Sequence, residues 1–317
     1  MRVVALSGGI GGAKLALGLY RVLPPSRLTV IVNTGDDFDH LGLRICPDID
    51  TTLYTLAGLA NTELGWGRQG ETWTFMKVLE ELGGEAWFRL GDGDLAVHVE
   101  RTRRLRSGET LSEVTRDIAR RFGVQARIVP ASDEEVRTRV HTPDGVLAFQ
   151  EYFVRRRCAP VVTALSYEGA ASAEGAPEAL AALTAQGLEA VILCPSNPYL
   201  SIDPMLAIPH LRAALRACAA PVVAVSPLVR GAALKGPAAK IMQELGVPRA
   251  QCAIAGHYGD LIDALVIDRA DAAEAAAVPL RHLITDTVMT SLADRERLAR
   301  EVLAFAGQLA AGKRGRA

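Results

Sequence analysis

The stretch Val3-Val-Ala-Leu-Ser-Gly-Gly-Ile-Gly-Gly-Ala-Lys14, close to the first residue of the chain, decides the fold. Its apolar run at 3–6 is short and leads into glycine, which predicts a buried parallel strand. Residues 8–12 predict a glycine loop, and residues 13–23 have the apolar spacing of a helix that stops at two prolines. A second apolar run at 28–32 predicts the next strand. Strand, loop, helix and strand form a βαβ unit, which predicts a mostly parallel sheet.

The rest of the chain continues this alternation after a middle part of different character. Beyond residue 158 we predict strands at 161–164, 190–194, 221–225 and 265–267, and helices at 177–186, 208–219, 236–245 and 295–309. The middle part predicts helices at 72–82, 95–105 and 111–122, and a β-hairpin that turns at Asp144-Gly145.

These elements predict an α/β fold, a Rossmann-like three-layer sandwich with a mostly parallel sheet and an inserted α+β cap. The nucleotide-binding core would consist of residues 1–64 and 159–312, and the cap subdomain of residues 65–158. Residues 313–317 are expected to form a frayed tail.

The composition excludes several classes of protein. The formal net charge is -1, whereas a protein that binds nucleic acid usually carries a clear basic excess. The five cysteines are scattered without a CxxC pair, so neither structural zinc nor a disulfide framework is expected. No stretch approaches the roughly 20 apolar residues that span a bilayer, and the N-terminal apolar run is too short for a signal peptide. We therefore expect a cytoplasmic protein without nucleic-acid or membrane partners, and a homodimer as the common oligomer.

The glycines between the first strand and the first helix predict a phosphate-binding site. Gly9, Gly11 and Gly12 allow backbone N–H groups to approach a phosphate, the helix N-terminus adds a favourable dipole, and Lys14 adds a positive charge. The pattern is not a P-loop, because no Gly-Lys-Ser/Thr follows at the required spacing. It is also not a dinucleotide fingerprint, since Lys14 stands where the third glycine would be. A tight turn without a ligand is the alternative.

Three acidic segments are expected to meet near the carboxyl edge of the sheet, where ligands of open α/β sheets bind. Their polar residues are Asn33, Asp36 and Asp37 after the second strand, Asp48 and Asp50 in the segment 46–52, and Asp92 and Asp94 in the segment 90–95. Crowded carboxylates repel one another unless a cation joins them, and Mg²⁺ with a diphosphate needs only one or two carboxylates. We therefore expect Mg²⁺ with a diphosphate among these carboxylates. The alternatives are that Asp48 and Asp50 cap a helix beginning near Thr51, and that Asp36 and Asp37 lie in a solvated turn.

Two further segments follow predicted strands later in the chain. Ser196 and Asn197 lie in a proline-bracketed turn and can hydrogen-bond a polar ligand, with a plain turn as the alternative. Ser226 follows the next strand, and Lys235 precedes a predicted helix, where it could meet a phosphate or be a solvated lysine. The six histidines show no HExxH or other close metal-ligand pair, and the basic run 101–106 is interpreted as a solvated helix face.

Together these segments resemble the 2-phospho-L-lactate transferase family of coenzyme F-420 biosynthesis. The matching segments are Leu6-Ser-Gly-Gly-Ile-Gly-Gly-Ala-Lys14, Val30-Ile-Val-Asn-Thr-Gly-Asp-Asp37, Ile45-Cys-Pro-Asp-Ile-Asp-Thr51, Leu90-Gly-Asp-Gly-Asp94, Cys194-Pro-Ser-Asn-Pro198, Val225-Ser-Pro-Leu228, Leu234-Lys-Gly-Pro237 and Thr285-Asp-Thr-Val-Met289. Ordered matches spread over most of the chain are far more specific than any single motif.

The resemblance implies a Mg²⁺-dependent transferase of substituted phosphate groups. Such enzymes move a phospho-acid group from a guanosine diphosphate-linked donor to the ribityl hydroxyl of the deazaflavin alcohol Fo, releasing GMP and forming coenzyme F-420-0 or its dehydro form. The acid is lactyl, enolpyruvyl or glyceryl, depending on the lineage. The resemblance also implies that Fo binds near Asp50 and the nucleotide on the glycine segment. The family usually has an arginine where this chain has Gly93, so the choice of donor is expected to differ here.

One alternative function comes from another class, the non-catalytic, nucleotide-sugar-binding regulators of the related gluconeogenesis-factor group. They share the glycine segment and much of the fold, but the segments 47–50 and 196–198 fit the transferase better. An NAD-dependent dehydrogenase is not favoured, because the glycine segment does not match the dinucleotide-binding fingerprint. In the transferase, displacement at phosphorus depends on positioning and charge neutralisation. Asp48 and Asp50 are then expected to hold Mg²⁺ against the diphosphate, and a nearby carboxylate to orient or deprotonate the attacking hydroxyl.

Overall fold

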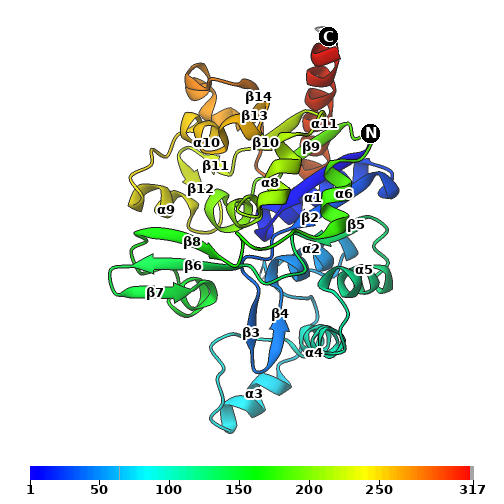
Figure 1. Cartoon of the computed structure of the whole chain (residues 1–317). Helices are drawn as coiled ribbons and strands as arrows, with labels where there is room; N and C mark the ends of the chain where they lie inside the picture. The colour runs from blue at the N-terminus through cyan, green and yellow to red at the C-terminus, as the bar shows by residue number, and fades with distance from the viewer. Residues whose placement is uncertain (64, 315–317) are drawn as a thin grey trace.

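A sheet of seven parallel strands forms the centre of the protein, shown by a computed structural model that describes residues 1–63 and 65–314. The strand order is β14-β13-β10-β9-β1-β2-β5 (Figure 1). The strands are β1 (Val3–Ser7), β2 (Leu28–Val32), β5 (Arg127–Pro130), β9 (Ala190–Leu193), β10 (Val222–Val225), β13 (Ala264–Asp268) and β14 (Arg281–Thr285). All neighbouring strands in this sheet are parallel, which confirms the prediction.

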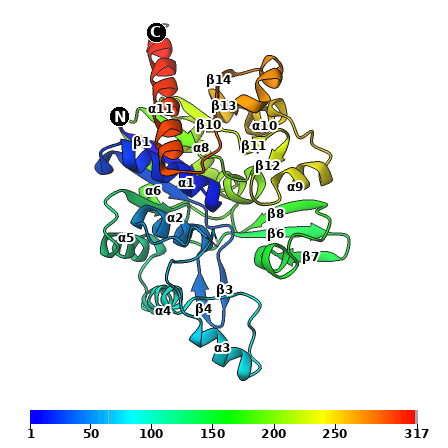
Figure 2. The ribbon, with the colours of Figure 1, turned by 180° about the vertical axis from the view of Figure 1, so that it is seen from behind.

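Helices cover both faces of the sheet. Alternate residues of β1 point to opposite faces, so that Val3 and Ala5 belong to one buried core and Val4 and Leu6 to another. The first face is covered by α1 (Gly9–Val22), α2 (Pro47–Ala57), α5 (Leu111–Arg121) and α11 (Leu292–Arg314). The second is covered by α6 (Pro177–Leu183), α8 (Pro209–Arg216), α9 (Ala238–Glu244) and α10 (Gln251–Tyr258). This is the predicted three-layer α/β sandwich, and Figure 2 shows α11 beside α1.

Smaller elements extend from the sandwich. The hairpin of β3 (Phe38–His40) and β4 (Leu43–Ile45) lies with α3 (Thr74–Glu81) and α4 (Asp92–Arg106) at the bottom of Figure 1. An antiparallel sheet of β6 (Arg137–Thr142), β7 (Gly145–Ala148) and β8 (Ala164–Glu168) projects to one side. The shorter elements include the antiparallel pair of β11 (Leu228–Val229) and β12 (Ala232–Ala233), and the helix α7 (Asp203–Leu206). Among the described residues, no helix has the length and apolar character needed to cross a membrane.

One expectation about the strands was not met. Of the residues predicted to form a strand at 161–164, only Ala164 is in one. It is the first residue of β8, which pairs with β6 and does not join the parallel sheet. Val162 is buried without being in a strand, because its side chain packs into a core and its N–H group donates to Glu244 Oε2 at 2.9 Å. In addition β5, which lies inside the predicted cap 65–158, pairs with β2 in the central sheet. The division into core and cap stays a prediction.

Four helices begin earlier than predicted, and one of them is α11, which begins at Leu292 where the sequence predicted residue 295. α1 begins at Gly9, α2 at Pro47 and α4 at Asp92, where the sequence predicted residue 13, Thr51 and residue 95. Glycine and aspartate are poor helix formers, but the first turn tolerates them, because its N–H groups have no intrahelical acceptor and carry partial positive charge. The glycine loop predicted at 8–12 is therefore mostly the first turn of α1.

Two chain segments differ from their predictions by a few residues. The hairpin between β6 and β7 turns at residues 143–144, one residue earlier than predicted, and Gly145 already pairs with Thr142. At the other end of the chain α11 continues to Arg314, so residues 313–314 are helical. The remainder of the predicted tail, 315–317, lies outside the described residues.

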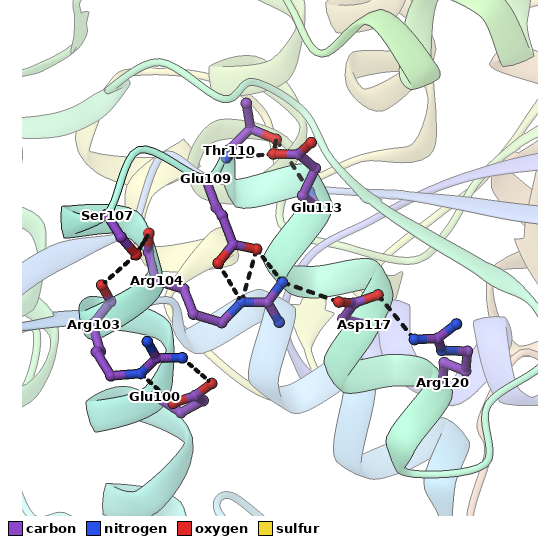
Figure 3. A network of polar contacts seen from close by, with 9 residues as sticks. All are labelled: Glu100, Arg103, Arg104, Ser107, Glu109, Thr110, Glu113, Asp117 and Arg120. Carbon is purple, nitrogen blue, oxygen red and sulfur yellow. Dashed lines mark hydrogen bonds and ion pairs between the residues drawn. The ribbon is translucent and has the colours of Figure 1, made fainter.

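The basic run 101–106 is not a solvated face throughout, because Arg101 and Arg104 are buried. Arg104 forms ion pairs with Glu109 and with Asp117 of α5, the latter at 3.0 Å (Figure 3). Buried arginines need such partners. Arg104 thus connects the end of α4 to α5 and fixes the position of the α4 helix relative to the sandwich.

Candidate active site

The candidate site lies where the strand order of the sheet reverses. From β1 the chain continues to β2 and β5 on one side, and to β9, β10, β13 and β14 on the other. In open parallel sheets, ligands bind outside the carboxyl ends of the strands at this point. Here Gly8 follows β1 and Ser196 follows β9, and the Gly8 N–H donates to Ser196 Oγ at 3.0 Å.

The glycines after β1 allow the first turn of α1 to approach its neighbours closely. A Cβ on Gly8 would lie 2.6 Å from Asp48 Oδ2, and one on Gly11 would lie 2.6 Å from the carbonyl oxygen of Pro195. Such distances leave no room for a side chain. The glycines are therefore required by the packing of the site itself, in addition to any ligand.

The first turn of α1 also presents backbone N–H groups. Gly9 donates its N–H to Asp48 Oδ1 at 2.6 Å. The next two N–H groups, of Ile10 and Gly11, come too early in the helix to reach a carbonyl one turn back. Together with the helix dipole they form a local positive potential that suits an anion.

Asn33 joins two buried carboxyl groups at the carboxyl end of β2. Its Nδ2 group donates to Asp48 Oδ2 at 3.0 Å and to Asp36 Oδ1 at 3.4 Å. Burial, and then the charges of Asp48 and Asp37, raise the pKa of Asp36 well above its usual range. Burial likewise raises the pKa of Asp48 to about 6, against hydrogen bonds from Asn33 and Gly9. Neither carboxyl forms an ion pair within the described residues, so the pair favours a proton or a bound cation.

Asp37 lines a cavity of about 340 Å³, and Arg44 and Arg137 line the same cavity. Burial raises the pKa of Asp37 to about 7, opposed by a hydrogen bond from the Cys46 thiol and by the nearby arginines. The Oδ1 atom of Asp37 is buried, and no donor for it is found in the described part of the chain. This carboxyl can therefore accept a hydrogen bond from a ligand or hold a proton.

Asp50 has different partners from Asp48, because residues two apart on a helix do not face the same way. Arg101 donates to both carboxylate oxygens of Asp50, to Oδ2 at 3.1 Å. His98 bridges two acids: its Nδ1 lies 3.6 Å from Asp50 Oδ2 and its Nε2 lies 3.3 Å from Asp94 Oδ2. The structure thus brings Asp50 and Asp94 together, as expected, but around an arginine and a histidine that were not predicted to be there.

The N-terminus of α4 is held by two side chains from the segment before it. Glu71 accepts hydrogen bonds from the N–H groups of Gly93 at 2.6 Å and Asp94 at 2.8 Å. Arg68 donates to the Gly93 carbonyl at 3.3 Å, and its guanidinium lies 5.7 Å from the centre of the Tyr54 ring. Tyr54 in turn donates its hydroxyl to Asp94 Oδ1 at 2.5 Å. The guanidinium of Arg68 therefore lies beside Gly93.

Three other predicted site residues make structural hydrogen bonds. Asp92 accepts hydrogen bonds from backbone N–H groups at the start of α3. Asn197 Oδ1 accepts the N–H groups of the helical turn at 198–202, and Ser226 Oγ accepts the N–H of Leu228 at 3.2 Å. Ligand contacts by these residues stay predictions.

Two predicted lysines lie near each other. Lys14 Nζ donates to the carbonyl of Met289 at 3.0 Å, in the segment between β14 and α11. Burial, and then the positive charges of Arg295 and Lys235, lower the pKa of Lys14. Lys14 thus lies on α1 beyond its first turn, while the buried carboxyl of Asp48 lies against that turn.

A family model described as 2-phospho-L-lactate transferase CofD matches residues 3–306. The chain belongs to this family. Proteins named phosphoenolpyruvate transferase are similar to it throughout. The one from Kitasatospora aureofaciens is 42% identical over 324 residues, which cover 98% of this chain and 100% of that protein. The one from Mycobacterium tuberculosis is 37% identical over 319 residues, which cover 92% of this chain and 96% of that protein.

As a CofD family member, the protein is a transferase of coenzyme F-420 biosynthesis, which confirms the resemblance noted in the sequence. A solved structure of a UPF0052 family protein from Bacillus halodurans shares the fold with a TM-score of 0.62 at 15% identity. The match covers 95% of this chain and 98% of the Bacillus halodurans protein. This likeness concerns the fold alone.

Of the two acidic groups in this CofD protein, one suits magnesium better. Mg²⁺ prefers oxygen ligands, and Asp36 and Asp48 offer only oxygen, with no arginine paired to them. The other group has ligand atoms within 4.8 Å of one another, and its members are Asp50, Asp94 and His98. It includes a nitrogen ligand, and Arg101 already pairs with Asp50. Of the predicted ligands, Asp48 has no ion-pair partner among the described residues, whereas Asp50 is already paired with Arg101.

Several residues of the site were missed in the sequence. His98 and Arg101 follow Asp94 at spacings of four and seven residues, which places all three on one face of a helix. This spacing was a usable signal. Tyr54 carried no local signal, because its partner Asp94 lies 40 residues away in the sequence.

Proposed function

We propose that the protein transfers an enolpyruvyl phosphate group from a guanosine diphosphate-linked donor to the hydroxyl of Fo. The products would be GMP and the dehydro form of coenzyme F-420-0. Membership of the CofD family over residues 3–306 carries this proposal, and the names of the relatives support the enolpyruvyl acid. Donors that carry 2-phospholactyl or phosphoglyceryl groups are the alternatives within the same reaction.

The chemistry is a displacement at phosphorus. The Fo hydroxyl oxygen forms a bond to the phosphorus that carries the acid, and the bond from this phosphorus to the GMP oxygen breaks. The hydroxyl proton passes to a carboxylate. Asp37 suits this task, because a proton acceptor works best when its pKa lies near the working pH.

The residues around α1 would bind the donor. We assign its phosphates to the N–H groups of Ile10 and Gly11 and to Lys14 and Lys235. Asp48, with Asp36, would hold Mg²⁺ on the other side, and the bound ion would neutralise charge on the diphosphate. Asp50 would lie near Fo, as the resemblance implies, with its carboxylate oriented by Arg101.

A mass-spectrometric assay tests this function. Fo is incubated with the protein, Mg²⁺ and each of the three guanylylated acids, and the formation of product and GMP is followed. We expect turnover with the enolpyruvyl donor above the other two. Binding of nucleotide without any product would instead favour the non-catalytic regulator, and faster turnover with another donor would correct the acid.

A further inference from the structure

Three positive side chains from distant parts of the sequence gather along α1. They are Lys14 on α1, Lys235 before α9 and Arg295 on α11. Lys14 is tied to the segment leading into α11 by its hydrogen bond to the Met289 carbonyl. One turn further along α1, a Cβ on Gly18 would collide with the carbonyl oxygen of Arg295. The start of α11 therefore packs directly against α1, as Figure 2 shows.

These three charges are not in salt bridges in the described part of the chain, and the nearby negative charge that acts on Arg295 is that of its chain neighbour Asp294. None of them forms an ion pair with a carboxylate in residues 1–63 and 65–314, whereas Arg297 and Arg300 of the same helix α11 both pair with glutamates. The Nε atom of Arg295 is buried, and no acceptor for it is found among the described residues. Like charges held together without a partner repel one another, and a bound anion would remove this repulsion.

The position of Lys14 indicates where such an anion would lie. Long side chains on a helix lean toward its N-terminus, over the preceding turn. For Lys14 the preceding turn is the one that carries the N–H groups of Ile10 and Gly11, and its Nζ atom lies 3.0 Å from the Met289 carbonyl oxygen. An anion bound at those N–H groups would be within the reach of this positive cluster.

We propose that Arg295 is a further phosphate-binding residue of the donor site, acting with Lys14 and Lys235 on a nucleoside diphosphate. This inference rests on the proposed function, in which the phosphates of the donor lie at the N-terminus of α1. A guanidinium can form two parallel hydrogen bonds to phosphate oxygens, which fixes the orientation of the phosphate as well as its charge. The helix α11, at the far end of the sequence from the glycines, is thereby part of the donor site.

Calorimetric binding of inorganic pyrophosphate and of GDP tests this assignment. The variant Arg295→Met keeps an unbranched apolar stem and removes the guanidinium with its charge. We expect it to weaken the binding of both probes about tenfold or more, as the loss of a charge-assisted hydrogen bond does, without changing the binding of Fo. The matched control is Arg300→Met, on the same helix, whose arginine pairs with Glu296 and is expected to leave all three affinities unchanged.

The outcomes separate this inference from the proposed function. Unchanged pyrophosphate affinity in Arg295→Met overturns the role of Arg295, and so does an equal loss of Fo affinity, which would indicate a general effect on folding. If Arg295→Met does not fold, the variant Arg295→Lys provides the test. It keeps the positive charge but loses the two parallel hydrogen bonds of the guanidinium, so pyrophosphate should bind about threefold more weakly. Wild-type pyrophosphate affinity in this variant overturns the role of Arg295. If the wild-type protein binds pyrophosphate but not GDP, the guanosine-linked donor is wrong while the assignment of Arg295 stands. Binding of neither probe overturns both.

Discussion

Arg101 of α4 donates hydrogen bonds to both carboxylate oxygens of Asp50 on α2, and both side chains are buried. A buried ion pair of this kind adds little net stability by itself, but the loss of one partner leaves the other charge without compensation. This asymmetry provides a direct test of how the site is held together.

We expect Arg101→Met to lower the free energy of unfolding by about 3–5 kcal/mol, because the Asp50 carboxylate stays buried without a partner. The double variant Asp50→Asn/Arg101→Met should be less destabilised than Arg101→Met alone, since it buries no unpaired charge. Urea denaturation measures both. The control Arg103→Met removes an exposed arginine paired with Glu100 and should change the stability by less than about 1 kcal/mol. Equal effects of the Arg101 and Arg103 variants would contradict the burial argument.

Asp48→Asn tests the proposed magnesium site. The substitution keeps the size of the side chain but removes the charge that a cation needs, so kcat/KM should fall about 100-fold or more. We also expect Asp50→Asn to abolish turnover, and EDTA to do so in the wild-type protein. Asp144→Asn, in the exposed hairpin turn, is the matched control and should keep full activity. Full activity in the presence of EDTA would rule out the metal.

Gly11→Ala tests whether the glycines are needed for packing. Its Cβ would lie 2.6 Å from the carbonyl oxygen of Pro195, so we expect the free energy of unfolding to fall by about 1–3 kcal/mol, as in other overpacked sites. Gly307→Ala on α11 is the control, because its Cβ meets no atom within 4 Å. Within a helix this change should raise stability by roughly 0.5–1 kcal/mol. If Gly11→Ala leaves stability unchanged, the glycine serves only the ligand.

Asp37 should make the protein less stable as the pH rises. Its pKa is about 7 in the folded protein, above the value of about 3.9 for an unfolded chain, so between these values the folded state binds the extra proton. The stabilisation that the protonated Asp37 contributes is therefore fully present below about pH 4. It decreases by about 1.4 kcal/mol per pH unit as the pH rises above this value, and is lost as the pH passes about 7. Denaturation of Asp37→Asn at several pH values measures this. The variant should gain stability relative to the wild type at about pH 8 and less at about pH 5, and a constant difference would contradict the raised pKa.

Gly93→Arg tests donor choice. A new arginine can hold a carboxylate or phosphate with a contact of about 1.5–3 kcal/mol, so relative kcat/KM among the three donors should shift about tenfold. A Cβ at this position would lie 3.1 Å from Glu71 Oε1 and 3.4 Å from Arg68 Nη1, both at the ends of flexible side chains that can move aside. Competition between mixed donors measures the ratio. Equal slowing of all donors would mean that the glycine only permits the turn.

The sequence predicted those parts of the protein whose signals are local. β1, α1 and β2 were predictable because buried strands read as apolar runs and the glycines mark the turn between them. β14 was missed because it is an edge strand, with an exposed arginine and histidine at its start and little apolar pattern. β5 was missed because it has only four residues and ends in proline.

The candidate site was predictable as a set of residues but not as an arrangement. The aspartates that follow β2 and those of α2 were identified, since strand ends and acidic segments are visible in the sequence. The partition of Asp48 and Asp50 into two groups was not, because it depends on Asn33 and Arg101, the latter 51 residues from Asp50. Tertiary contacts of this kind leave no periodic trace.

The central place of β1 in the sheet has a consequence for how the protein is made. β1 is synthesised first, yet it lies between β2, which follows soon after it, and β9, which begins only at Ala190. While the ribosome elongates the chain, one edge of β1 therefore waits for a strand that does not yet exist. An unpaired apolar strand edge is prone to wrong association. The edge of β1 that faces β9 is therefore unpaired in any nascent chain that stops before Ala190.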